Sequence, residues 1–397
     1  MTPSRFIPLA LLTPTLAFAQ PADAPWYLGA QLGLTHASNV YRLGNSSPEG
    51  QDWIRSAMLL AGARLHLGRQ RFYLEGHARD VDYRRNSALH HLEHGLNGGL
   101  DWALASRWTG NLSVNSRRSL APFNAGTLPN TKDKNIETQN QARASVQYGL
   151  FGPWRVDAQA SWQERDFSLA SFDPYEYRFS SVGLGLRWVP NDALQLRLGL
   201  RESDGEYPRA QRLNQGYLAE QFDNRSVEAS ANWQLSGKQS VKLRVSQGTG
   251  SRDGGRSSRT RAGGLDWSWL ATARLQFNLT GTLDQGSDAR DSGFALVENN
   301  STQIRQLKAL ASYVLAPKLN LDASVSQMNR DISGLSGQTA VDGSDRTRSA
   351  ALALRWAISQ KGQFSCEVAT DRRSGRAGFS IPYSARSAGC NLQWLVY

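Results

Sequence analysis

The chain has 397 residues, with 45 basic and 34 acidic side chains and a formal net charge of +11. Its 36 glycines, 12 tryptophans and 12 tyrosines are spread evenly, which excludes an intrinsically disordered chain. Beyond the N-terminus no run of about 18 apolar residues occurs, which excludes a helical membrane protein, and no change of composition marks a second domain.

Residues 1–19 have the features of a secretory signal peptide. Arg5 supplies the positive start, residues 6–16 are apolar, and Ala17-Phe18-Ala19 is a small–x–small cleavage site. The apolar run is too short for an uncleaved membrane anchor. We therefore expect export across a bacterial inner membrane, a mature charge of +10, and a short periplasmic segment over residues 20–25.

From Trp26 to the C-terminus apolar and polar residues alternate with a period of two. The pattern is clearest over residues 26–35, 92–104, 194–201, 227–235 and 275–284. Such a pattern predicts β-strands that have one apolar and one polar face, and no helical spacing is sustained anywhere. Residues 26–397 are therefore expected to form one all-β domain.

Short and long connections alternate along this domain. Eight short turn signals lie at residues 68–70, 105–107, 152–153, 190–192, 236–238, 271–273, 316–318 and 359–362, and longer polar stretches lie between them, including 36–51, 119–135, 202–221, 248–258 and 286–301. A propeller or a sandwich has no reason for this alternation, whereas a transmembrane barrel has short periplasmic turns and long external loops. We predict an antiparallel up-and-down β-barrel of about 18 strands, with 16 as the alternative, in the outer membrane of a Gram-negative bacterium.

Nine of the 12 tryptophans lie near the predicted periplasmic strand ends. Besides Trp26 they are Trp102, Trp108, Trp154, Trp188, Trp233, Trp269, Trp356 and Trp394. Membrane–water interfaces favour amphipathic rings, so these residues are expected to form an aromatic girdle rather than a protein core. The terminal aromatic Tyr397 is typical of such barrels, although the alternation places it on the opposite face from Trp394.

The polar strand face carries 12 basic and 11 acidic residues by phase. The arginines that alternate most cleanly with apolar neighbours, and are therefore expected to face the lumen, are Arg143, Arg155, Arg187, Arg197, Arg201 and Arg244. They would either form cross-strand ion pairs that stiffen the wall or line a selective, hydrated lumen, and the two roles are compatible.

Because the polar face is balanced, the surplus positive charge is expected in external loops. The residues assigned there are Arg84, Arg85, Lys132, Lys134, Arg209, Arg212, Arg252, Arg256, Arg259, Arg346, Arg348, Arg372, Arg373 and Arg376. They would meet the phosphates of lipopolysaccharide or an acidic polysaccharide. Nucleic acid is not an expected partner, since no basic–aromatic binding motif accompanies the charge.

The two cysteines are expected to form a disulfide. Cys366 and Cys390 lie on the last two predicted strands, on the apolar phase, each 12 residues from Gly378. A hairpin centred there places them directly opposite, at a distance a disulfide can bridge in the oxidising periplasm. The alternative is a pair of small lipid-facing neighbours with free thiols.

No catalytic or metal-binding motif is found in the sequence. The His90-His91-Leu92-Glu93-His94 run would send His91 and His94 to opposite faces of a strand. His77 lies beside Glu75 and Arg79 on the polar face, without a nucleophile identifiable from the sequence. We expect neither a metal, a cofactor nor an enzymatic activity.

Short motifs in the first 100 residues resemble the EpsL-like outer-membrane proteins, which are encoded with exopolysaccharide and exosortase systems. They are Ser38-Asn39-Val40-Tyr41-Arg42-Leu43, a strand from Trp53, Gly68-Arg69-Gln70-Arg71-Phe72 and Leu100-Asp101-Trp102. The resemblance implies a barrel that assists the synthesis or export of an extracellular polysaccharide, together with other components of a secretion system. It brings no catalytic residues.

Three functions follow from these observations. The first is the polysaccharide-export barrel, the second a general or substrate-specific diffusion porin, and the third a structural or adhesive barrel without transport. A long loop folded into the lumen would favour the porin, and a plugged lumen would favour the third function.

Overall fold

The computed structural model describes residues 24–44, 50–124, 131–149, 151–213, 216–253, 257–286, 297–336, 339–375 and 380–397. The predicted signal peptide and most of the segment 20–25 lie outside these residues. The strands are β1 (Trp26–Ala37), β2 (Asp52–Leu67), β3 (Gln70–Tyr83), β4 (His91–Leu104), β5 (Trp108–Leu120), β6 (Ile136–Gly149), β7 (Trp154–Phe167), β8 (Tyr177–Asn191), β9 (Leu194–Arg212), β10 (Tyr217–Ser236), β11 (Gln239–Arg252), β12 (Ser258–Thr272), β13 (Leu275–Gly286), β14 (Val297–Ala316), β15 (Leu319–Ser336), β16 (Thr339–Ala357), β17 (Gly362–Gly375) and β18 (Tyr383–Val396). Two short 3-10 helices, η2 (Ser87–Leu89) and η3 (Ala170–Tyr175), lie in the connections β3–β4 and β7–β8.

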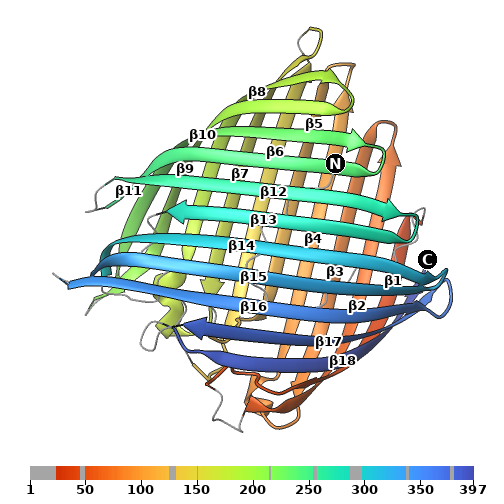
Figure 1. The fold of residues 1–397 in the computed structure, drawn as a ribbon, viewed down its shortest axis with the longest axis vertical. Coiled ribbons are helices and arrows are strands. Elements are labelled where there is room, and N and C mark those ends of the chain that lie inside the picture. Colours follow the sequence, from red (N-terminus) through yellow and green to blue (C-terminus); the bar gives the residue numbers. More distant parts are fainter. Residues whose placement is uncertain are drawn as a thin grey trace.

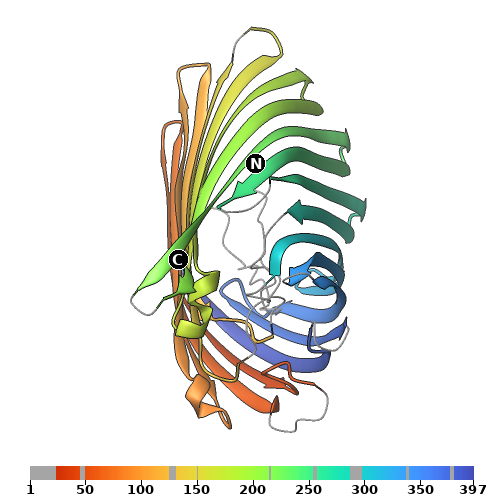
Figure 2. The same ribbon diagram turned by 90° about the vertical axis from the view of Figure 1, so that its left-hand side faces the viewer.

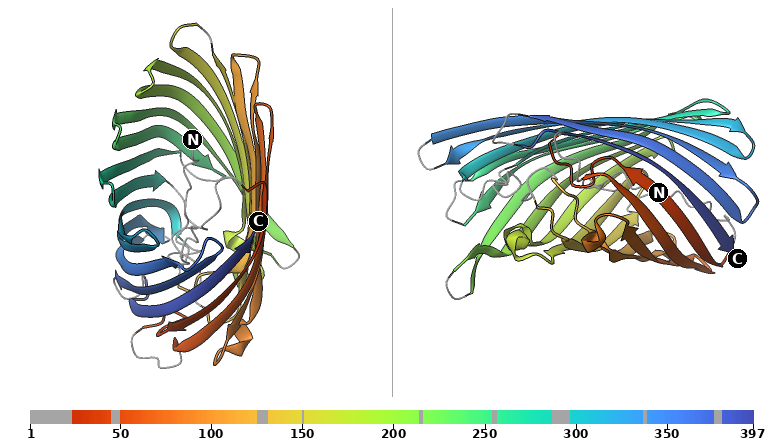
Figure 3. Two further views of the ribbon diagram at one scale, coloured as in Figure 1. Left: turned by 90° about the vertical axis from the view of Figure 1, so that its right-hand side faces the viewer. Right: turned by 90° about the horizontal axis from the view of Figure 1, so that it is seen from below.

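Each strand pairs antiparallel with the next, and β1 pairs with β18, so the sheet closes into a barrel. The 18 strands of the described residues confirm the predicted fold and settle the strand number. The barrel is flattened: β12–β16 cross the front of Figure 1 while β2–β7 run behind them at a steep angle. Figure 2 and Figure 3 show these two parts of the sheet as facing walls.

The eight short turns lie where the sequence predicts them. One predicted loop is wrong, because β9 and β10 continue through most of residues 202–221 and leave only residues 213–216 as a connection. In this stretch both strand faces are polar, with Glu202 and Asp204 on the outer face and Ser203 on the inner one. Beyond the hydrocarbon layer a strand needs no apolar face, so the ladder continues after the alternation has disappeared.

The two faces of the wall differ in burial as the alternation predicts. Leu198 is 60% exposed on the outer face, whereas the adjacent Arg197 side chain is only 8% exposed on the inner face. Inner residues pair with inner residues on the neighbouring strands: Arg197 lies opposite Arg187 on β8 and Ser230 on β10. The inner face is concave, so its polar side chains cover one another, while the outer leucines are left for lipid.

No helix of the described residues is long and apolar enough to span a membrane.

Candidate functional site

A network of charged side chains lines the inner face of β7–β10. Arg187 Nε donates to Asp157 Oδ1 at 2.7 Å, and Arg197 Nε donates to Asp157 Oδ2 at 2.9 Å. On the other side Arg197 Nη1 lies 3.5 Å from Glu228 Oε2, and Arg201 Nε donates to Glu228 Oε1 at 2.7 Å. Two carboxylates are therefore shared among three guanidinium groups, which leaves this network with a net positive charge.

A glycine makes the contact between Arg197 and Asp157 possible. Arg197 is on β9 and Asp157 on β7, so the guanidinium must cross the inner face of β8. Gly185 of β8 lies beneath it, and a Cβ there would be 2.6 Å from Arg197 Nε. A side chain at position 185 would therefore force the guanidinium to shift. The alternation of apolar and polar residues does not reveal this crossing.

The remaining predicted arginines extend the positive sector to β6 and β11. Arg155 lies directly opposite Arg187 in the β7–β8 register. Arg143 of β6 is within electrostatic range of Arg201 and Arg244, although the three come from different strands. No carboxylate within ion-pair distance of Arg143 is found in the described part of the chain. All six arginines thus belong to one sector, β6–β11, and this sector carries more positive than negative charge.

The sector formed by β2–β4 has a different charge arrangement. Arg64 Nη2 donates to Glu75 Oε1 at 3.0 Å, and Arg71 pairs with Asp101. Arg79 Nη1 lies 3.5 Å from Glu93 Oε2. Each of these arginines has its own carboxylate. The overall balance of the polar face, which the sequence indicates, therefore hides a separation into a paired sector and a positive sector.

At the end opposite the short turns, two long loops meet the inner face of distant strands. Asn124, in the β5–β6 loop, donates through Nδ2 to the backbone oxygen of Arg42 at 2.8 Å, and Arg42 belongs to the β1–β2 loop. Arg373 Nη1 of β17 donates to Asn124 O at 2.6 Å, and Arg42 Nη2 lies 3.0 Å from Asp371 Oδ2 of the same strand. Because β4, β3, β2, β1 and β18 separate β5 from β17, the β5–β6 loop must cross the interior to make these contacts.

An apolar cluster holds the same loops together. Tyr41 contacts Phe123 with ring centroids 4.9 Å apart, and Leu89 of η2 is completely buried beside them. On the side of the barrel wall the cluster consists of Val81, Tyr83, Leu120 and Ile136. The sequence indicates these connections only as polar stretches. In the structure they contain the residues that hold the loops across this end of the barrel and narrow its opening.

The predicted girdle tryptophans all lie on the outer phase of their strands, close to the short-turn end. Trp154 and Trp188 are directly opposite in register, with ring centroids 6.4 Å apart. Trp108 contacts Tyr148 at 4.6 Å, and Trp269 contacts Phe277 at 5.6 Å. The others are Trp26 on β1, Trp102 on β4, Trp233 on β10, Trp356 on β16 and Trp394 on β18. This position is where an interfacial aromatic belt would lie.

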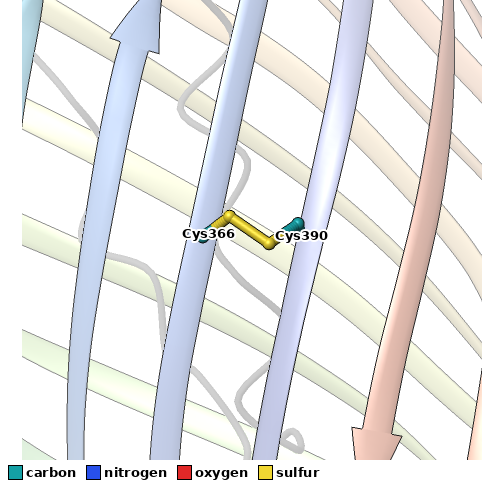
Figure 4. Close-up of a disulfide and its surroundings, with 2 residues drawn as sticks. All are labelled: Cys366 and Cys390. Atoms are coloured by element: carbon teal, nitrogen blue, oxygen red, sulfur yellow. A yellow bond between two sulfur atoms is a disulfide. The ribbon is translucent and has the colours of Figure 1, made fainter.

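Cys366 of β17 and Cys390 of β18 are opposite one another in register, with Cα atoms 4.0 Å apart, and are joined by a disulfide (Figure 4). They share the outer phase with Phe364 and Leu392, so the bond lies on the lipid side of the wall.

The histidines do not gather at one site. His91 and His94 face opposite sides of β4, as their spacing predicts, and His91 Nε2 lies 3.2 Å from Glu93 Oε1 on the inner side. His77 also faces inward, near Arg79 and Glu93. In the described ranges no group of three or more His, Cys, Asp or Glu side chains could hold a metal ion.

One part of the charge assignment is wrong. Eight residues that the sequence places in external loops lie on strands instead: Arg209 and Arg212 on β9, Arg252 on β11, Arg259 on β12, Arg346 and Arg348 on β16, and Arg372 and Arg373 on β17. As in β9 and β10, a strand beyond the hydrocarbon layer needs no apolar face, so its sequence cannot be told from that of a polar loop. Arg256 and Arg376 lie outside the described residues.

Comparison with known proteins gives a fold but no family. No family model and no curated protein matches the chain, so membership of the EpsL-like family stays a prediction. Among solved structures, the outer membrane protein OpdK of Pseudomonas aeruginosa has a TM-score of 0.50 and 12% sequence identity, over 94% of this chain and 99% of that chain. OpdQ of the same organism has a TM-score of 0.48 and 9% identity, over 94% and 97% of the two chains. OccK3 of that organism has a TM-score of 0.46 and 12% identity, over 94% and 95%. The likeness shows the fold: the chain is a closed 18-stranded antiparallel β-barrel similar to that of OpdK.

Proposed function

We propose that this protein is a diffusion porin for small anionic solutes. The observation that carries the proposal is the separation of charge on the inner face. There β2–β4 hold matched ion pairs, whereas β6–β11 hold the six predicted arginines around Asp157 and Glu228, and the other two carboxylates of this sector, Glu137 and Glu220, have arginine partners of their own. An anion entering the barrel would be attracted to the second sector. A cation would find no equivalent surplus of carboxylates there.

The arginines also suit stepwise movement of an anion. Arg197 and Arg201 are four residues apart on β9, which separates their Cα atoms by about 13 Å along the strand. Guanidinium groups bind carboxylates and phosphates through two parallel hydrogen bonds and stay charged at any physiological pH. A series of such groups, partly neutralised by Asp157 and Glu228, would bind an anion at each step without holding it strongly.

The narrowed mouth favours the porin over polysaccharide export. The contacts of Asn124 with Arg42 and Arg373 bring a loop across the interior, and such a loop limits passage to small solutes. The likeness of fold to OpdK also agrees better with the porin. Polysaccharide export rests on the resemblance of short sequence motifs, and deleting the gene and assaying secreted polysaccharide in the host would test it separately.

Ion selectivity in a planar bilayer tests the proposal. Under a salt gradient the wild-type barrel is expected to show a reversal potential of the sign for anion preference. Replacing Arg143, Arg201 and Arg244 by glutamine should move the reversal potential towards cation preference. The matched control replaces three outer-face arginines, Arg225, Arg348 and Arg372, by glutamine and should leave it unchanged.

Two outcomes would count against the porin. An equal shift in both triple variants would mean that overall charge, and not the lumen, sets the selectivity. A folded wild-type barrel that conducts no ions would favour the structural or adhesive barrel.

A further inference from the structure

The outer face of β14–β18 carries a patch of arginines at the end away from the short turns. This outer arginine patch consists of Arg305 on β14, Arg346 and Arg348 on β16, Arg372 on β17 and Arg386 on β18. All five side chains are exposed. They share the outer phase with Leu352, Cys366 and Leu392, on the side of the wall opposite the lumenal arginines.

Two arginines of the patch oppose each other directly. Arg348 is the register partner of Arg372, and Arg386 lies one step along the ladder, opposite Thr370. Like charges at directly opposed positions of a sheet destabilise the pair unless an anion lies between them. The opposition of Arg348 and Arg372 therefore destabilises the protein alone, but it would strengthen the binding of a polyanion placed between them.

Neighbouring amides orient the guanidinium groups without neutralising them. Arg346 Nε donates to Asn329 Oδ1 at 2.9 Å, and Arg348 Nε donates to Gln327 Oε1 at 3.1 Å. Among the described residues on the outer face of β14–β18, the carboxylate at this level is Asp331, which lies 2.9 Å from Arg305. Among the side chains that the structure describes, the other four arginines of the patch have no carboxylate within ion-pair distance.

Outer-face arginines on the other wall are arranged differently. Arg178 Nε on β8 donates to Glu164 Oε1 at 2.9 Å and its Nη1 lies 3.6 Å from Glu206. Arg225 on β10 donates to Glu202 Oε1 at 2.8 Å. Both arginines form ion pairs with carboxylates of the neighbouring strands. They therefore serve as a matched control for the outer arginine patch.

The position of the patch relates it to the lipid surface. On β16 the outer residues from Trp356 to Leu352 are exposed and apolar, and Arg348 begins the polar part. Eight residues separate Trp356 from Arg348, which is about 26 Å of extended strand; at the tilt of about 35–45° usual for barrel strands this is about 20 Å of height, near the upper edge of an apolar band about 25 Å tall. With Trp356 at the periplasmic interface, Arg348 and its register partner Arg372 would lie at the outer-leaflet edge of the band, where their long side chains can reach headgroups.

A groove beside these arginines offers space for a headgroup. It has a volume of about 440 Å³ and is lined by Arg305, Asn329, Asp331, Ser344, Asp345, Arg346, Ser374 and Gly375, and its two carboxylates are paired with Arg305 and Arg330. Below it the exposed apolar side chains of Leu352, Val368 and Leu354 continue towards the periplasmic end. The surface therefore joins polar, positively charged contacts to an apolar wall, which suits an amphiphile whose head is a polyanion.

We propose that the outer arginine patch binds the phosphates of lipopolysaccharide, with Arg348 and Arg372 on one phosphate and the acyl chains against the apolar band of β16–β18. Guanidinium groups bind phosphate through paired charge-assisted hydrogen bonds, and the phosphate removes the repulsion between the two arginines. The site is independent of the proposed transport of anions, because it lies on the outer face.

Native mass spectrometry of the mature barrel in mild detergent tests this site. The lipid probe is lipid A with two phosphates, compared with the same lipid lacking phosphates and with inorganic pyrophosphate as a competitor. Replacing Arg348 and Arg372 together by glutamine should weaken lipid A binding at least about tenfold, the loss of one charge-assisted hydrogen bond or more. The matched control, Arg178 and Arg225 both to glutamine, should change it less than about twofold.

The wild-type barrel is expected to bind the phosphorylated lipid in preference to the dephosphorylated one, and pyrophosphate should not displace it. Equal weakening in both double variants, or equal binding of the two lipids, would overturn the proposal. Pyrophosphate binding as tight as that of lipid A would also overturn it, since the site would then take free phosphate. If the glutamine variant does not fold, Arg372→Glu places a carboxylate opposite Arg348; it should bind lipid A no better than the dephosphorylated lipid.

Discussion

Replacing Cys366 and Cys390 together by alanine should lower the free energy of unfolding by about 3.4 kcal/mol. The two cysteines are 24 residues apart, and the loop-entropy relation for a disulfide closing a loop of that length gives about this value at 25 °C. Both side chains face outward, so their truncation leaves no internal cavity and adds no packing term of the kind seen in protein cores. The predicted loss therefore comes almost entirely from the greater freedom of the unfolded chain.

Urea unfolding of the barrel in lipid vesicles measures this loss, with tryptophan fluorescence as the signal. Val368→Ala is the matched control, because Val368 is exposed on the same face of β17 and lies opposite Ala388 without a covalent bond. It should cost less than about 1 kcal/mol. An unchanged unfolding free energy in the double alanine variant would refute the reasoning, as would two free thiols found by mass spectrometry in the non-reduced wild-type protein.

Three further substitutions test the wall, the lumenal network and the mouth. Leu198→Arg puts a charge on the lipid face and should cost about 2–4 kcal/mol in vesicle unfolding, whereas Gln159→Arg on the inner face should cost less than about 1 kcal/mol; equal costs would reverse the assignment of faces. Gly185→Ala should destabilise the barrel by about 1–3 kcal/mol in the same assay, because the new methyl group displaces a buried guanidinium, and a neutral result would contradict the crossing. Arg373→Gln removes the fully buried anchor of the β5–β6 loop and should raise single-channel conductance, while the exposed neighbour substitution Arg372→Gln should not.

The sequence by itself determined the wall of this protein. Alternation with a period of two and eight short turns sufficed for the closed antiparallel barrel, because a strand in a membrane must put apolar side chains towards lipid at every second position. The same rule predicts the opposition of Cys366 and Cys390, since the register of a hairpin follows from its centre. It failed where both faces of a strand are polar, over residues 202–221 and at the strand arginines Arg252, Arg259, Arg346, Arg348, Arg372 and Arg373.

Only the tertiary structure decided how the charges are distributed and where the loops lie. The sequence indicates nearly equal numbers of basic and acidic residues on the polar face, but the contact of Arg197 on β9 with Asp157 on β7 crosses β8 at Gly185. The contact of Asn124 with Arg373 joins residues 249 positions apart. Neither contact leaves a periodic signal, because strand phase is a local property, whereas ion pairing and loop docking depend on the curvature that brings separate strands together.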